Sequence, residues 1–126
     1  MKRIVTVQDI SCLGKCSLTV ALPVISAMGI EASIIPTAVL SAHTIFEGHT
    51  FRDLTNDIPK IGEHWKKEGF TFDAIYTGYL GSQKQIEIIV IDDGITKISD
   101  YAFFACDQLS KVAIPKTVSV IGQFAF

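Results

Sequence analysis

Polar side chains that could bind a small molecule follow three short apolar segments of the sequence. They come in three groups along the chain: Asp9 with Ser11, Thr37 with His43 and Thr44, and Thr77 with Tyr79. Carboxylates, hydroxyls and imidazoles make hydrogen bonds, and a tyrosine ring can also stack on a flat ligand. These residue types suit ligand recognition, provided that the elements before them bring the three groups together.

The elements that carry these groups alternate between strands and helices. Short β-branched apolar segments predict strands, and apolar residues at helical spacing predict helices. We expect strands at 2–8, 31–37 and 72–77, and helices at 15–28 and 54–68. Such alternation is typical of an α/β fold, whose right-handed connections place the carboxyl ends of parallel strands on one edge of the sheet. Ligands bind at that edge in open α/β sheets, so the order of the elements predicts a small-molecule site there.

Proline and glycine set the expected bounds of these elements. Pro36 should stop the second strand, and the residues from 37 to 53 are expected to form a loop. Pro23 falls inside the first helix and predicts a kink or a later start. Gly29 and Gly69 stand where a glycine ends a helix.

The composition excludes several classes of protein. With 48% hydrophobic and 19% charged residues, the chain should fold rather than stay disordered. A net charge of −2 without a basic run argues against binding to nucleic acid or to an acidic membrane surface. Residues 18–30 are too short and too interrupted to span a bilayer, and the N-terminus lacks a signal-peptide core. We therefore expect a cytoplasmic protein, in which Cys12, Cys16 and Cys106 are reduced thiols.

A repeat with an offset of 23 residues occupies the end of the chain. Residues 90–103, VIDDGITKISDYAF, align with residues 113–126, AIPKTVSVIGQFAF, and Ile98 matches Ile121. The matched positions are the apolar ones that a stacked repeat buries. A period in the low twenties is typical of leucine-rich-repeat solenoids.

The N-terminal part of the chain resembles a known family of enzymes. The resemblance is carried by IVTVQDISCLGKCSLTVALPVISAMGIEASIIPTAVLSAHT, FRDLTNDIP and FDAIYTGYLGSQKQ. These segments are similar to the first part of pyridoxal or pyridoxamine kinases, the vitamin B6 kinases of the ribokinase-like superfamily. Such kinases transfer the γ-phosphate of ATP to the 5′-hydroxymethyl group of pyridoxal, pyridoxine or pyridoxamine. The resemblance covers residues 1–88 and implies a partial ribokinase-like (Rossmann-like) parallel sheet with helices.

The same resemblance implies roles for the polar residues. Asp9, with Ser11 close by, would contact the polar groups of the pyridine ring. His43 and Thr44, in the segment SAHT, match the substrate loop of the family and would lie near that ring. Tyr79, in GYLGS, matches an aromatic residue that packs against the substrate.

Most of these residues also have an ordinary structural interpretation. Asp9 could cap the helix that follows, because Asp is a favoured N-cap residue. His43 could be a loop residue bonded to backbone, and Tyr79 could be a packing aromatic. We expect His49 and His64 at the surface, without a role in binding.

Residues 89–126 resemble the BspA-like class of leucine-rich repeats. The pattern is carried by ITKISDYAFFACDQLSKVAIPKTVSVIGQFAF, with strand-like segments expected at 88–92 and 111–115. The resemblance implies a short solenoid segment of under two repeats that follows the α/β part. Such repeats act as binding surfaces and usually belong to cell-surface or secreted proteins, unlike the cytoplasmic location that the N-terminal part implies.

The kinase part lacks the elements expected to bind nucleotide and metal. The ribokinase-like superfamily uses a glycine-rich anion hole and a catalytic Asp in a GxGD motif, and this sequence has neither that motif nor GxxxxGK[ST]. ATP and Mg²⁺ are thus implied by the family, but we expect no catalytic residue, no metal site and no kinase activity in this chain alone. The alternatives are a repeat-based binding module, a non-functional fusion joined within residues 86–89, or weak binding of pyridoxal without catalysis.

Both parts should leave open surfaces. The third expected strand, residues 72–77, lacks the next strand of a complete kinase sheet. The repeat has no polar cap and would expose Phe124 and Phe126. We therefore expect a tendency to self-associate through the sheet edge and the uncapped repeat.

Overall fold

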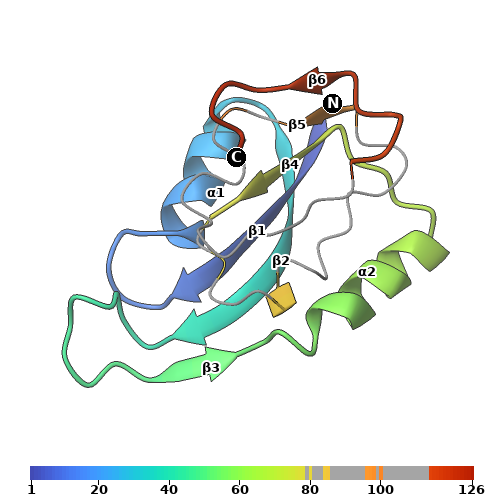
Figure 1. Ribbon diagram of the computed structural model, residues 1–126. Helices are drawn as coiled ribbons and strands as arrows, with labels where there is room; N and C mark the ends of the chain where they lie inside the picture. The colour runs from blue at the N-terminus through green and yellow to red at the C-terminus, as the bar shows by residue number, and fades with distance from the viewer. Residues whose placement is uncertain (79, 81–83, 86–95, 99, 101–113) are drawn as a thin grey trace.

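Six strands form one sheet in the computed structural model, in the order β3-β2-β1-β4-β5-β6 (Figure 1). The structure describes residues 1–78, 80, 84–85, 96–98, 100 and 114–126. Along the chain the elements are β1 (Arg3–Ser11), α1 (Leu18–Ala27), β2 (Glu31–Leu40), β3 (Phe51–Asp53), α2 (Ile58–Lys67), β4 (Ala74–Thr77), β5 (Lys97–Ile98) and β6 (Val120–Ile121). Figure 1 shows α1 and α2 well apart, with strands of the sheet between them. The predicted α/β class is confirmed.

The centre of the sheet is β1, which pairs in parallel with β2 on one side and with β4 on the other. Its register places Val5 opposite Ser33 of β2 and Ile75 of β4. Residues 5–8 of β1 are all buried, as is usual for a parallel strand covered on both faces. The carboxyl ends of β1, β2 and β4 therefore lie on one edge of the sheet, as the order of the elements predicts.

Two of the predicted strands continue further than expected. β1 runs on to Ser11, and β2 passes through Pro36 to Leu40. Proline is tolerated there because β3, the outer neighbour of β2, pairs only with residues 38–40, so no partner on that side needs the missing N–H at position 36. The antiparallel strand β3 also replaces the end of the loop that we expected from 37 to 53.

The two helices are shorter than predicted at their N-terminal ends. α1 starts at Leu18 and keeps Pro23 inside it, which agrees with the expected later start. α2 starts at Ile58, and its Pro59 falls in the first turn, where the missing N–H breaks no hydrogen bond within the helix. Gly29 and Gly69 follow the helices with φ angles of +71° and +72°, the left-handed conformation expected of terminating glycines.

The repeat strands extend the same sheet. β5 pairs in parallel with β4, and β6 pairs in parallel with β5. Lys97 lies opposite Val120 and Ile98 opposite Ile121, so each pair is 120 − 97 = 23 residues apart. The prediction of an unpaired edge at the third strand is wrong, because β5 covers it. The strands also lie later in each repeat than predicted: residues 114–115 are not in a strand, and 88–92 and 111–113 lie outside the described residues.

One hydrophobic core joins the two parts of the chain. Its buried members come from β1 and β4, from Leu80, and from the repeat: Val5, Val7, Ile75, Leu80, Ile98 and Ala125. Trp65 of α2 and Phe72 pack against this core, with their ring centroids 5.3 Å apart. Repeat and α/β segments thus bury apolar surface against each other instead of forming separate cores.

Neither helix in the described part of the chain is long and apolar enough to cross a membrane. Cys12 and Cys16 are free thiols, as predicted, and Cys106 lies outside the described residues.

Candidate functional site

A cavity of about 470 Å³ lies at the carboxyl ends of β1 and β2. This volume falls in the range of small-molecule sites. The lining comes from the ends of both strands, the turn before α1, the loop between β2 and β3, and the segment after β4: Asp9, Ser11, Cys16, Ser17, Thr37, Ala38, Leu40, His43, Thr44, His49, Phe51 and Gln85. Segments far apart in the sequence therefore meet at the predicted edge of the sheet.

Four of the side chains that the sequence singles out line this cavity together: Asp9, Ser11, His43 and Thr44. Tyr79 lies outside the described residues. Thr77 is buried at the end of β4 and does not line the cavity. The structure thus brings the first two polar groups together, while their roles in binding stay predictions.

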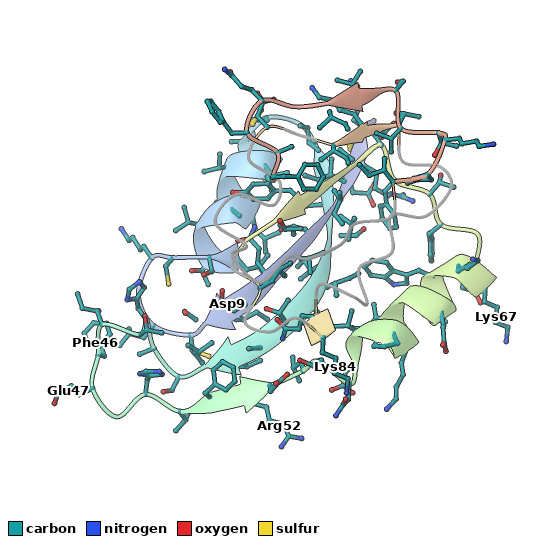
Figure 2. The ribbon with its side chains drawn as sticks, viewed as in Figure 1. Asp9, Phe46, Glu47, Arg52, Lys67 and Lys84 are labelled. Carbon is teal, nitrogen blue, oxygen red and sulfur yellow. The ribbon has the colours of Figure 1, made fainter. Side chains whose placement is uncertain are left out.

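Asp9 and Ser11 lie on one face of β1, because residues two apart in a strand point the same way. The Ser11 hydroxyl donates a hydrogen bond of 3.4 Å to Asp9 Oδ2, and Ser11 is almost fully buried. Figure 2 shows Asp9 at the carboxyl end of β1. The alternative that Asp9 caps a helix is wrong, since α1 begins at Leu18 with Ser17 in the N-cap position.

His43 is held by backbone contacts on both sides. Its N–H donates to Leu13 O at 2.8 Å, and its ring Nδ1 accepts from the Ile45 N–H at 3.0 Å. Gly14, with a φ of +96°, lies so close that an added Cβ would be 2.9 Å from His43 Cβ. His43 therefore lines the cavity and is also bonded to backbone, and its neutral ring carries its proton on Nε2.

His49 lines the cavity as well, although we expected it at the surface. The loop is closed at its base by Ser41 and Thr50: Ser41 N–H donates to Thr50 O at 3.1 Å, and Thr50 N–H donates to Ser41 Oγ at 2.8 Å. This closure returns His49 toward the strand ends. Its ring Nδ1 lies 3.0 Å from Phe46 O, which can only accept, so Nδ1 donates and Nε2 is left as an acceptor. His64 is exposed on α2, as predicted.

Gln85 is a buried polar residue of the cavity that the sequence does not single out. Its Nε2 donates to Thr37 O at 3.1 Å and to Thr55 Oγ1 at 2.9 Å. Thr55 in turn donates from its hydroxyl and its N–H to Asp53 Oδ1, and these bonds lower the pKa of the Asp53 carboxyl. A glutamine in a predicted helix after a turn gives no sequence signal for this role, because its partners lie 30 and 48 residues away.

Within the ranges that the structure describes, no three His, Cys, Asp or Glu side chains are grouped so as to hold a metal ion. The described residues therefore do not fit a metal site, and we assign no metal ligand to them. Hydrogen-bonding groups and apolar walls are what the cavity offers to a ligand.

Two solved structures connect this arrangement to known enzymes. A protein from Bacteroides thetaiotaomicron assigned as a phosphomethylpyrimidine kinase, in a crystal form with pyridoxal, is 40% identical with a TM-score of 0.70. The match covers 96% of this chain and 36% of that chain. The pyridoxal kinase of Lactobacillus plantarum is 33% identical with a TM-score of 0.69, and the match covers 71% of this chain and 33% of that chain. This chain resembles part of a pyridoxal kinase.

The pyridoxal kinase likeness extends to distant structures. Pyridoxal kinase from Leishmania donovani, in complex with ADP, has a TM-score of 0.68 at 17% identity, which shows a common fold. That match covers 71% of this chain and 31% of the Leishmania chain. The chain thus spans between 31% and 36% of the length of the kinases that it matches. A comparison with curated protein sequences gave no significant match.

Besides its pyridoxal kinase likeness, the chain has a second similarity at its C-terminal end. Residues 74–126 match the family model described as a BspA type leucine rich repeat region (6 copies). The matched range contains β4, β5 and β6, so it begins inside the sheet that the kinases share. The predicted repeat is confirmed, whereas the proposed join within residues 86–89 lies outside the described residues.

Proposed function

We propose that the cavity binds the pyridine ring of a B6 vitamer: pyridoxal, pyridoxine or pyridoxamine. The convergence of Asp9, Ser11, His43 and Thr44 on one cavity at the strand ends supports this proposal most directly. A relative that is 40% identical to this chain was crystallised with pyridoxal, which supports the same ligand class.

The chemistry of the lining suits such a ligand. A carboxylate at Asp9 can bond to the ring nitrogen or to the phenolic hydroxyl, and the hydroxyl of Thr44 can donate or accept. His43 offers an N–H and His49 a lone pair in their neutral forms, so a polar group on the ring finds both kinds of partner. Phe51 and Leu40 supply apolar wall against the flat ring.

Binding is tested by titrating the purified chain with pyridoxine, followed by ligand fluorescence. Pyridoxine is preferred over pyridoxal because it has no aldehyde that could form Schiff bases with surface lysines. Thr44→Val should weaken binding by roughly five- to tenfold through the loss of one hydrogen bond. Thr71→Val, the same change at an exposed residue away from the cavity, should leave it unchanged. No binding at millimolar pyridoxine would reject the proposal.

Phosphate transfer is not expected from these residues alone. The related kinases act on ATP-type nucleotides over a longer chain, and the described residues provide neither a metal cluster nor a nucleotide-binding motif. We therefore expect no ADP release above the blank when the chain of 126 residues is mixed with pyridoxal, ATP and Mg²⁺ in a coupled assay. Turnover above the no-enzyme blank would contradict this expectation.

A second proposal is a binding module formed by the repeat. Its support is the pairing of β5 with β6 at an offset of 23 residues, together with exposed apolar side chains beside β6: Ile114, Val120, Ile121, Phe124 and Phe126. β6 is the last strand of the sheet, so its outer side offers unpaired backbone groups to another strand. A second copy of the chain is the partner that we expect to associate there.

Self-association of this kind is tested by sedimentation velocity over a range of concentrations. Ile121→Lys places a charge on the open edge and should shift the chain toward the monomer. Ile45→Lys, at the exposed tip of the loop between β2 and β3, adds the same charge away from β6 and is the control. A wild-type chain that stays monomeric at all concentrations would reject this proposal.

A further inference from the structure

Gln85 links the segment after β4 to two other segments on the wall of the cavity. Its side chain is 3% exposed although glutamine is usually a surface residue. The neighbouring Lys84 is exposed and bonds to Asn56 Oδ1 at 3.1 Å, which places this segment beside the turn before α2, as Figure 2 shows. Residues 84 and 85 thus face in different directions, one toward solvent and one toward the cavity.

The carbonyl of Thr37 is the first group that Gln85 holds. Gln85 Nε2 donates to Thr37 O at 3.1 Å, and the N–H of Leu54 donates to the same oxygen at 3.0 Å. Thr37 is itself 2% exposed and lines the cavity. One backbone oxygen at the end of β2 therefore joins the turn after β3 and the segment after β4.

The second group is the hydroxyl of Thr55, which fixes the direction of the hydrogen bonds. Thr55 Oγ1 donates its proton to Asp53 Oδ1, so it must accept from Gln85 Nε2. The Thr55 N–H also donates to Asp53 Oδ1, at 2.6 Å. A donor at position 85 satisfies Thr37 and Thr55 together, whereas an ionised carboxylate of the same size would face only acceptors.

We propose that Gln85 is a positioning residue, which holds the carboxyl end of β2 and the turn between β3 and α2 in the places that shape the cavity. Its amide acts through Thr37 and Thr55, since the end of β2 leads directly into the loop that carries His43 and Thr44. The inference rests on the proposed function only for the identity of the ligand. The hydrogen bonds that carry it do not depend on that ligand.

Gln85→Glu tests the need for a donor without changing the size of the side chain. At neutral pH the new carboxylate cannot donate, and we expect pyridoxine to bind about tenfold more weakly. Burial raises the pKa of such a carboxyl, so at about pH 5 it should be protonated in part and able to donate again. Binding relative to wild type at the same pH should then recover. Lys84→Glu adds a carboxylate next to it on the exposed side and should show neither the loss nor the recovery.

A readout that needs no ligand separates this inference from the proposed function. In Gln85→Leu, the Leu54 amide should exchange its proton at least fivefold faster, and the pKa of Asp53 should rise in an NMR titration. If Gln85→Leu does not fold, Thr55→Val removes the same acceptor, and exchange at Leu54 remains the readout. Failure of wild type to bind pyridoxine would reject the proposed function alone. Unchanged exchange at Leu54, or a loss in Gln85→Glu that does not vary with pH, would overturn the positioning role.

Discussion

His43 and His49 show how much of the site depends on single hydrogen bonds. Both are imidazoles of one loop, yet the Ile45 N–H makes Nδ1 of His43 an acceptor and the Phe46 carbonyl makes Nδ1 of His49 a donor. The two neutral rings therefore present opposite groups at Nε2. The same kind of local control acts on Asp53, whose carboxylate accepts two hydrogen bonds from Thr55.

The hydrogen bonds to Asp53 should make stability depend on acid pH. The side-chain hydrogen bond from Thr55, followed by its backbone bond, lowers the pKa of Asp53 below the ordinary 3.8. The native state therefore favours the charged form, so this contribution is present above the unfolded pKa and is lost as the pH falls through the folded pKa. Asp53→Asn should be less stable than wild type at pH 6 and approach it near pH 2. Urea unfolding across that range measures the difference, and a constant difference would contradict the assignment.

At the scale of elements, the exits of β1 and β4 are packed closely together. The N–H of Gly78 donates to Val7 O at 3.0 Å, directly after β4. Gln8 is buried next to it and donates from Nε2 to Thr6 Oγ1 at 2.8 Å. A Cβ added at Gly78 would lie 2.8 Å from Gln8 Cγ and 3.0 Å from its Oε1. Glycine at this position is therefore required by the neighbouring strand and not by its own backbone angles.

Gly78→Ala should lower the free energy of unfolding by about 1–3 kcal/mol, because Gln8 is held by a buried hydrogen bond and has little room to move. Gly62→Ala is the matched control, since an added Cβ there has nothing within 4 Å. In the interior of α2 that change should stabilise by about 0.5–1 kcal/mol. Denaturant unfolding measures both variants. Equal effects would mean that the close approach of Gln8 has no energetic consequence.

At the scale of the whole molecule, the repeat contributes to the fold of the kinase-like part. Ile98 of β5 is fully buried in the core that contains Val7 and Ile75. Its counterpart Ile121, one repeat later and opposite it in the sheet, is 52% exposed. Two identical residues in equivalent repeat positions therefore have different surroundings, because only β5 packs on the α/β core.

Ile98→Ala should cost about 2–5 kcal/mol of unfolding free energy, as is usual for a large apolar side chain removed from a core. Ile121→Ala, the same change on β6, should stay within about 1 kcal/mol. Amide exchange in β1 should accelerate in Ile98→Ala, since β1 shares that core. Protection of β1 that is unchanged in a destabilised Ile98→Ala chain would mean that the two parts unfold independently.

The sequence by itself determined the features that follow from local pattern. Apolar segments ended by polar residues predicted three parallel strands with Asp9, Ser11, His43 and Thr44 near their ends, and the offset of 23 residues predicted the pairing of the repeat strands. Only the tertiary structure decided the rest: the cover of β4 by β5, the length of β2 beyond Pro36, and the place of Gln85 in the cavity. These depend on hydrogen bonds and packing between residues distant along the chain, such as Gln85 and Thr37. Local propensity and periodicity carry no information on such contacts.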